Sequence, residues 1–365
     1  MILTRFPLLV SLAICVVAVR SPSARAQGRI VIETLHSRAL QGNRIGDTPD
    51  RKVTIYLPLS YDRDTARRYP AVYLLHGTTS DPREWLDGSY QGLNLSLAMD
   101  SLAAAGLSEY IVVMPLADND FGGSFYVNSA AFGRWEDFVV TELVPFIDAR
   151  FRTLPRRRSR GLAGQSMGGF GALYLAGRHA KTFGHVYAMS ACCLGFVGEL
   201  APDSEEWATA RAPRLRAMAA AFAPQSSGER AAVPTPMPFV ADSAGRIEKV
   251  EPLARAWSEY LPLDRLSRDP NLYRRLCTIA LEFGRQDEIP SVRLGTLAFA
   301  SELKRAGIPH TLDEYTGGHT NQTRKRFETA LLPFFARVLA TQEERGVCET
   351  ASDADPGRAR RRMSE

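Results

Sequence analysis

The sequence predicts an α/β fold, in which a mostly parallel β-sheet carries helices on both faces. The first observation is that short apolar segments alternate with longer segments of helical periodicity along most of the chain, a pattern typical of βαβ units. The second is that segments such as 71–75 (AVYLL) and 110–114 (YIVVM) are almost wholly apolar, as expected of strands buried on both faces. The third is the segment 164–168 (GQSMG), a Gly-x-Ser-x-Gly motif between an expected strand and an expected helix.

The individual elements follow from local patterns in the sequence. Strands are expected at 30–35, 53–57, 71–75, 110–114, 159–163, 186–189, 278–283 and 311–315. Helices are expected at 93–105, 135–149, 169–176, 292–306 and 327–339. The first two strands alternate or run apolar, and later apolar runs are closed by loop residues such as Gly77 and Pro115.

Residues 1–26 have the three parts of a secretory signal peptide. A positive charge in residues 1–5 precedes an apolar stretch at 6–19, and small residues at 24–26 (ARA) offer a cleavage site before Gln27. We therefore expect a mature chain that is secreted or periplasmic and that contains no membrane span. The alternative is that this segment is retained as an N-terminal anchor.

The rest of the chain predicts one domain over residues 27–345, followed by a disordered tail at 346–365. The tail has no apolar periodicity. Within the domain, residues 198–261 interrupt the alternation of strands and helices and are rich in Ala, Pro, Ser and charged residues. We interpret this segment as a lid-like insertion before the next strand. The alternative is a partly ordered surface excursion.

Charge and cysteine content argue against some classes of function. The formal net charge is +5, but residues 1–26 hold three arginines and no acidic residue, so the remainder carries 5 − 3 = +2. This small charge does not support nucleic-acid binding. The spacing of Cys192, Cys193, Cys277 and Cys348 fits neither a zinc site nor a dense disulfide framework. We expect no metal and no cofactor.

The Gly-x-Ser-x-Gly motif predicts that Ser166 is a nucleophile. Between a strand and a helix, this motif forms a sharp turn that exposes the serine hydroxyl. Gly164 and Gly168 permit strained backbone angles and a close approach of sheet and helix. The alternative is an ordinary Gly/Ser turn that joins the two elements.

A serine nucleophile needs a base, and the base needs an orienting acid. His319 lies in the loop at 316–320 (TGGHT), after the last expected strand, and is the predicted base. His310 begins that strand and so lies at its wrong end. Asp287 follows the preceding strand and is the predicted acid, with Glu288 as the alternative. This order of serine, acid and histidine is the order found in α/β-hydrolases.

Acyl transfer also needs hydrogen-bond donors for the oxyanion. The backbone N–H groups of Met167, after the nucleophile, and Thr78, after an early strand, are the predicted donors. Trp85, Phe121 and Tyr126 are predicted to line an acyl or aryl pocket. Aromatic packing beneath the loops is the alternative for these three side chains.

Several of these segments together resemble a known family. They are 74–77 (LLHG), Trp85, 135–138 (WEDF), 142–148 (ELVPFID) and 164–173 (GQSMGGFGAL). With them the chain resembles the putative-esterase (esterase D-like) family of α/β-hydrolases, which includes feruloyl and other carboxylesterases, S-formylglutathione hydrolases, siderophore esterases and mycolyltransferases. The resemblance implies an α/β-hydrolase fold with a Ser/Asp/His triad. Mycolyltransferases carry Asp-Gly where this chain has His76-Gly77, and the 198–261 insertion is longer than in compact members.

These observations predict an exported serine carboxylesterase that works through an acyl-enzyme. The expected substrate is a small-molecule or polysaccharide-linked ester, and no nucleic-acid partner is expected. Two alternatives remain open: an acyltransferase that uses the same acyl-enzyme, and a binding protein in which the fold persists without catalysis.

Overall fold

The computed structural model describes residues 27–209, 213–222 and 236–341 of the chain. The expected signal peptide at 1–26 and the expected tail at 346–365 lie outside the described residues.

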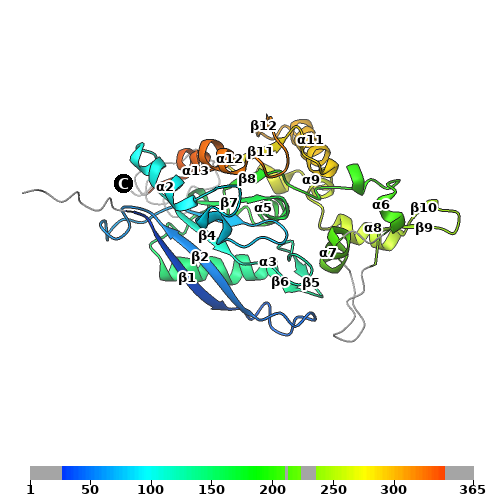
Figure 1. The fold of residues 1–365 in the computed structure, drawn as a ribbon, viewed down its shortest axis with the longest axis horizontal. Coiled ribbons are helices and arrows are strands. Elements are labelled where there is room, and N and C mark those ends of the chain that lie inside the picture. The colour runs from blue at the N-terminus through cyan, green and yellow to red at the C-terminus, as the bar shows by residue number, and fades with distance from the viewer. Residues whose placement is uncertain (1–26, 210–212, 223–235, 342–365) are drawn as a thin grey trace, which may run out of the picture.

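An eight-stranded sheet forms the centre of the described chain, with the strand order β1-β2-β4-β3-β7-β8-β11-β12 (Figure 1). Its strands are β1 (Arg29–His36), β2 (Asp50–Leu57), β3 (Ala71–Leu75), β4 (Ile111–Pro115), β7 (Arg160–Gln165), β8 (His185–Met189), β11 (Thr278–Gly284) and β12 (Thr311–Tyr315). The pairs β1–β2 and β2–β4 are antiparallel, and all other neighbours are parallel. All eight expected strands are present, and the predicted α/β class is confirmed.

Helices connect the strands of the sheet, and further helices follow the last strand, β12. They are α1 (Glu84–Asp87), α2 (Leu95–Ala104), α3 (Trp135–Asp137), α4 (Val144–Arg150), α5 (Met167–Arg178), α6 (Glu206–Thr209), α7 (Pro213–Phe222), α8 (Glu251–Ser258), α9 (Pro262–Arg268), α10 (Asn271–Arg274), α11 (Pro290–Arg305), α12 (Thr323–Arg326) and α13 (Leu332–Val338). The 3₁₀ segments are η2 (Arg157–Ser159) and η3 (Gly198–Leu200), and the π-helical segments are η1 (Phe138–Leu143) and η4 (Phe327–Leu331). Two short hairpins pair β5 (Asn128–Ser129) with β6 (Gly133–Arg134) and β9 (Phe239–Ala241) with β10 (Ile247–Lys249).

Two of the expected helices are less regular than the sequence suggests. The expected helix at 135–149 is made of α3, η1 and α4, so its middle is a π-helix, and the expected helix at 327–339 begins with the π-helical segment η4. None of the described helices is long and apolar enough to cross a lipid bilayer.

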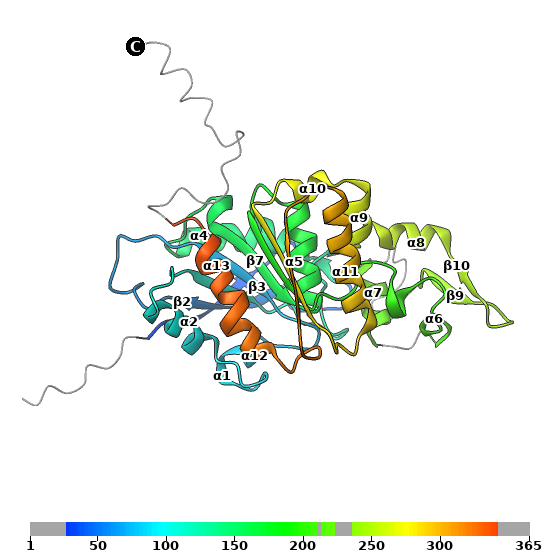
Figure 2. The ribbon, with the colours of Figure 1, turned by 90° about the horizontal axis from the view of Figure 1, so that it is seen from above.

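Helices cover both faces of the sheet (Figures 1 and 2). The sheet therefore separates two hydrophobic cores. Successive side chains of a strand point to opposite faces. Tyr73 and Leu75 of β3 therefore pack in the core that includes α4, α5 and α11, whereas Val72 and Leu74 pack with α2 and α13. Every side chain of β3 is buried, which explains why this strand is apolar throughout.

The described parts of the segment 198–261, residues 198–209, 213–222 and 236–261, lie between β8 and β11 and extend toward one end of the molecule (Figure 1). An aromatic cluster joins it to the core. Phe222 of α7 stacks on Tyr260, with ring centroids 5.0 Å apart, and lies 5.7 Å from Phe170 of α5. Trp257 of α8 packs edge-on against Phe222 at 5.5 Å. The insertion is therefore integrated into the domain, and its role as a lid stays a prediction.

The loops that follow the parallel strands all lie at one edge of the sheet. The strands β3, β4, β7, β8, β11 and β12 run in the same direction, so their carboxyl ends face the same way. The loops at this edge carry Thr78 after β3, Ser166 after β7, Asp287 after β11 and His319 after β12.

Candidate active site

Ser166 occupies a strained turn between β7 and α5. Its backbone has φ +55° and ψ −119°, a conformation that non-glycine residues rarely adopt. Both flanking glycines are required by close packing. A Cβ atom on Gly164 would lie 2.3 Å from the carbonyl of Gly168, and one on Gly168 would lie 1.9 Å from the carbonyl oxygen of Leu75. The motif therefore forms the strand–turn–helix arrangement expected of a nucleophile elbow.

Backbone hydrogen bonds hold this turn in place. The N–H of Ser166 donates to the carbonyl of Met189 at 3.1 Å, and the Ser166 carbonyl accepts from Phe170 at 3.0 Å and from Cys192 at 3.2 Å. Ser166 as a whole is partly exposed. The strained residue is thus anchored on β8 and α5 without being buried.

His319 is paired with Asp287. Its Nδ1 atom lies 2.8 Å from Oδ2 of Asp287, and the Asp287 side chain has no exposed surface. An ionised carboxylate can only accept hydrogen bonds, so Nδ1 carries a proton and Nε2 of the neutral imidazole keeps its lone pair. The second carboxylate oxygen of Asp287 accepts from the N–H of Ile289 at 3.0 Å. This pair has the chemistry of a base with its orienting acid.

The alternative acid, Glu288, is also close to His319 but contacts a different group. Its Oε2 atom accepts a hydrogen bond from the backbone N–H of His319 at 3.1 Å. Further bonds join the two loops: the N–H of Gln286 donates to the Gly317 carbonyl at 2.9 Å, and the Gly317 N–H donates to Oε1 of Gln286 at 2.6 Å. The loop after β11 therefore holds the backbone of the histidine loop as well as the imidazole.

The loop after β3 lies beside Ser166. A Cβ atom on Gly77 would lie 3.5 Å from Cβ of Ser166, which places the backbone leading to Thr78 at the elbow. His76 fixes this loop with both ring nitrogens: Nδ1 donates to the Gly77 carbonyl at 2.7 Å, and Nε2 accepts from the N–H of Ala117 at 2.8 Å. Complete burial lowers the pKa of His76, so the neutral ring serves as a structural link.

Met167 begins α5, and the N–H groups of a first helical turn have no partner within the helix. Its N–H lies next to the serine, and its role as an oxyanion donor stays a prediction. The Met167 side chain is buried against Gly123, where an added Cβ atom would lie 2.4 Å from the sulfur. The loop that contains Gly123 thus packs directly on the residue after Ser166.

The three aromatic residues predicted to line a pocket differ in burial. Trp85 is 1% exposed and packs on Phe327 at 5.8 Å. Tyr126 has no exposed surface, and its hydroxyl donates to the carbonyl of His76 at 3.0 Å. These placements fit the packing alternative, since neither ring offers a surface to a substrate. Phe121 is partly exposed and packs on Phe132 at 5.3 Å, so it retains the pocket-lining role as a prediction.

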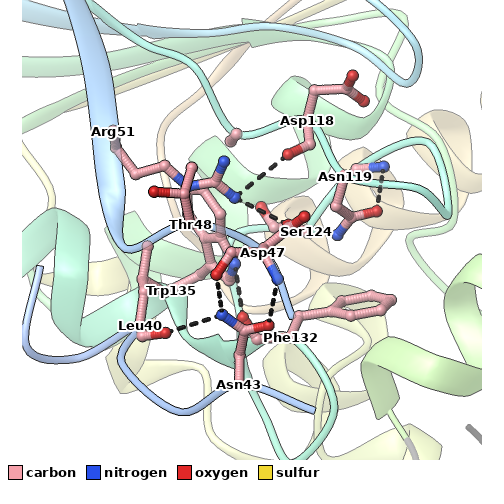
Figure 3. Close-up of polar contacts among 12 residues, drawn as sticks. Leu40, Asn43, Asp47, Thr48, Arg51, Asp118, Asn119, Ser124, Phe132 and Trp135 are labelled. Carbon is pink, nitrogen blue, oxygen red and sulfur yellow. Dashed lines mark hydrogen bonds and ion pairs between the residues drawn. The ribbon is translucent and has the colours of Figure 1, made fainter. Parts of the chain in front are cut away.

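A buried polar cluster behind the loop after β4 is not apparent from the sequence (Figure 3). The Nη2 atom of Arg51 lies 3.0 Å from Oδ2 of Asp47 and donates to the Asp118 carbonyl at 3.3 Å, and the guanidinium lies 4.6 Å from the ring centroid of Trp135. Burial raises the pKa of Asp47 and lowers that of Arg51. Next to this ion pair, Oδ1 of Asn119 accepts from two backbone N–H groups of the same loop, those of residues 121 and 123.

This cluster supports the site indirectly. The carbonyl of Gly122 accepts from the N–H of Thr79 at 2.8 Å, so the loop held by Arg51 is bonded to the loop that carries Thr78. Arg51 and Asp47 are four residues apart in the sequence, a spacing shared by ordinary surface pairs, and only the fold reveals their burial. Among the described residues, no group of three or more His, Cys, Asp or Glu side chains is arranged to hold a metal ion.

The serine elbow, the histidine loop and the parallel sheet that joins them define an α/β-hydrolase, which confirms the predicted fold class. Residues 46–338 match the model of the family described as Putative esterase. Because this match covers most of the chain, the protein belongs to that family, as its sequence motifs predicted.

Curated relatives match one part of the chain. An esterase of Mycobacterium tuberculosis is 35% identical over 153 residues, which are 41% of this chain and 30% of the relative. An endo-1,4-beta-xylanase/feruloyl esterase of Xylanibacter ruminicola is 34% identical over 137 residues, 36% of this chain and 18% of the relative. The chain thus spans less than a third of the length of either relative.

Solved structures match over most of their length. A ferulic acid esterase has 25% identity and a TM-score of 0.61, with 85% of this chain and 98% of that chain covered. An S-formylglutathione hydrolase from Agrobacterium tumefaciens has 18% identity and a TM-score of 0.58, with coverage of 88% and 99%; at this identity the similarity concerns the fold alone.

Proposed function

We propose that this protein is an exported serine carboxylesterase in which Ser166, His319 and Asp287 form the catalytic triad. The observation that carries the proposal is the buried hydrogen bond between His319 and Asp287 at the sheet edge where Ser166 occupies a strained turn. Membership of the Putative esterase family supports the reaction class.

In the first half of the proposed reaction, Oγ of Ser166 attacks the ester carbonyl carbon while Nε2 of His319 takes the hydroxyl proton. Asp287 stabilises the imidazolium that forms. The N–H groups of Met167 and Thr78 donate to the oxyanion of the tetrahedral intermediate. When the intermediate collapses, the alcohol leaves with the proton from His319, and an acyl-enzyme remains.

In the second half, His319 takes a proton from a water molecule as that water attacks the acyl-enzyme. The carboxylic acid then leaves, and the proton returns to Oγ of Ser166. If an acceptor alcohol attacks in place of water, the same site acts as an acyltransferase. Product analysis with and without added alcohols separates these two outcomes.

The proposed substrate is a small-molecule or polysaccharide-linked carboxylic ester. Two similar proteins are named ferulic acid esterase or feruloyl esterase, so feruloyl esters are the first substrates to test. Export rests on the signal-peptide pattern of residues 1–26. It is consistent with Cys277 being disulfide-bonded, because disulfides persist in oxidising compartments. N-terminal sequencing of exported protein should begin at or near Gln27.

The proposal is tested with purified mature protein and its Ser166→Ala variant on p-nitrophenyl acetate and on a feruloyl ester. The variant should lose turnover by roughly 10⁴-fold or more, and a fluorophosphonate should label the wild-type protein and fail to label the variant. Near-normal turnover or strong labelling of the variant would show that Ser166 is not the nucleophile.

A further inference from the structure

Gln165, the last residue of β7, directly precedes Ser166. Its side chain is buried and forms hydrogen bonds with three other residues of the protein. It is 2% exposed. Its Nε2 atom donates to the backbone carbonyl of His319 at 2.9 Å and to Oγ1 of Thr323 at 3.2 Å. Its Oε1 atom accepts from the hydroxyl of Tyr90 at 3.0 Å. One buried amide therefore connects the elbow strand with the histidine loop, with α12 and with the turn before α2.

The orientation of this amide follows from the chemistry of its partners. The backbone carbonyl of His319 can only accept a hydrogen bond, so the amide NH₂ of Gln165 must face it. The second NH₂ proton reaches Thr323, whose own hydroxyl donates to the carbonyl of Thr320 at 2.7 Å. The Tyr90 hydroxyl is then left to donate to Oε1. No other arrangement satisfies all of these groups.

His319 is consequently held at three separate points. Asp287 binds the imidazole and Glu288 binds the backbone N–H, and both belong to the loop after β11. Gln165 binds the backbone carbonyl and is the only one of the three on the element that carries Ser166. The first two contacts reach Ser166 through the pairing of β11 with β8 and of β8 with β7. The third contact is made by the residue directly before Ser166 and therefore relates the position of His319 to that serine most directly.

We propose that Gln165 is a positioning residue that sets the distance between the Ser166 hydroxyl and the imidazole of His319. The inference rests on the proposed function, because it needs His319 to act as the base for Ser166. Proton transfer requires the two groups at hydrogen-bond distance, and a misplacement of about 1 Å can cost roughly 10²-fold in rate. The other hydrogen bonds of the histidine loop, at Gly317 and at the N–H of His319, join it to the loop after β11, so loss of the Gln165 contact should shift the loop without unfolding it.

The test compares Gln165→Met and Gln165→Glu with the wild-type mature protein. Methionine keeps the approximate length of the side chain without either hydrogen-bonding group, and glutamate keeps its shape but cannot donate when ionised. Both variants should lower kcat by about 10- to 100-fold and leave KM within about twofold. The loss should be similar for p-nitrophenyl acetate and for a larger ester, because the base is displaced and substrate contacts are unchanged. The rate of fluorophosphonate labelling should fall in parallel.

His185→Met is the matched control. His185 is also fully buried, and its Nε2 atom lies 3.1 Å from a backbone carbonyl, that of Arg158, but it occupies the opposite end of the sheet. This variant should lose thermal stability and keep its kcat. A Gln165→Met variant with wild-type kcat, or one whose kcat loss is matched by His185→Met at equal loss of Tm, would overturn the positioning role.

The His319→Ala variant separates this inference from the proposed function. If His319→Ala is inactive while Gln165→Met is fully active, the base is assigned correctly and only the role of Gln165 is wrong. If His319→Ala retains near-normal activity, the proposed triad fails and the role of Gln165 fails with it.

Discussion

The two neighbouring acids Asp287 and Glu288 both bind His319, but they bind different parts of it. Oδ2 of Asp287 lies 2.8 Å from the imidazole Nδ1, whereas Oε2 of Glu288 lies 3.1 Å from the backbone nitrogen. The Asp287 side chain is fully buried, and the Glu288 residue is exposed. A carboxylate shielded from water stabilises a developing imidazolium more strongly than an exposed one. The geometry therefore separates an acid that orients the imidazole of His319 from an acid that holds the backbone of the same residue.

This division predicts unequal effects of two conservative substitutions. Asp287→Asn should lower kcat by roughly 10³- to 10⁴-fold, because an amide in place of the carboxylate favours the wrong imidazole tautomer. Glu288→Gln keeps an oxygen that can accept a hydrogen bond from the N–H of His319, so it should lower kcat by less than about tenfold. Steady-state kinetics on p-nitrophenyl acetate measures both variants. A larger loss in Glu288→Gln would transfer the acid role to Glu288.

The buried His185 predicts a pH-dependent loss of stability. Burial lowers the pKa of His185 from its usual value near 6.5 to about 4. At a pH between these two pKa values, His185 is protonated in the unfolded chain and neutral in the folded protein. The free energy of unfolding therefore decreases as the pH is lowered. At pH 5 the titration of His185 should lower the free energy of unfolding by about 2 kcal/mol relative to pH 8.

Urea denaturation of the wild type and of His185→Met at pH 8 and pH 5 isolates this contribution. The decrease in the free energy of unfolding from pH 8 to pH 5 should be about 2 kcal/mol smaller in the variant than in the wild type. Burial lowers the pKa of His76 as well, but that histidine is present in both proteins and cancels in the comparison. Equal pH dependence in the two proteins would mean that His185 does not titrate in this way.

The ion pair between Arg51 and Asp47 (Figure 3) predicts a stability effect that its sequence spacing does not suggest. Arg51→Met should destabilise the protein by about 3 kcal/mol, because it leaves the carboxylate of Asp47 partly buried without its cation. Adding Asp47→Asn to this variant should restore at least about 1 kcal/mol of the free energy of unfolding, since the unpaired carboxylate is then removed. Chemical denaturation of the two single variants and the double variant tests this. Strictly additive losses would show that the two side chains are not coupled.

The aromatic cluster of the insertion predicts that this segment contributes to global stability. Phe222→Ala should cost about 3–5 kcal/mol, because the buried ring contacts Phe170 of α5 and leaves a cavity when removed. Val240 lies on the β9–β10 hairpin and is 40% exposed, so Val240→Ser should change stability by less than about 0.5 kcal/mol. Similar small effects of both substitutions in thermal or urea unfolding would show that the insertion folds independently of the core.

The same cluster also limits how the proposed lid can be tested. Replacing all of residues 198–261 with a short linker would remove Phe222, Trp257 and Tyr260 and expose Phe170 of α5. A shorter excision confined to the β9–β10 hairpin keeps these contacts. If the hairpin governs access of large substrates, its removal should raise KM for a large ester and leave p-nitrophenyl acetate turnover within about twofold. An unchanged KM for the large ester would exclude the hairpin from substrate selection.

The sequence by itself determined the strands of the sheet, the elbow at Ser166 and the order in which the candidate catalytic residues occur. These features depend on local signals: the polarity of consecutive residues and glycines placed where backbones approach closely. The loops that carry Asp287 and His319 could be placed at one edge because parallel strands end at the same side of a sheet. The same reasoning predicted Asp287 as the acid but left Glu288 open as the alternative, since adjacent residues share the same loop.

The tertiary structure decided the features that depend on contacts between distant residues. Gln165 looks like an ordinary motif position. His319 is 154 residues away in the sequence, and the link between the two exists only because the fold places β7 beside the histidine loop. Trp85 and Tyr126 could have faced either a pocket or the core, and their burial depends on Phe327 and on the His76 loop. Periodicity reports which side chains prefer to be buried. Which partners they meet, and whether a polar group finds a donor or acceptor there, is set by packing across the whole domain.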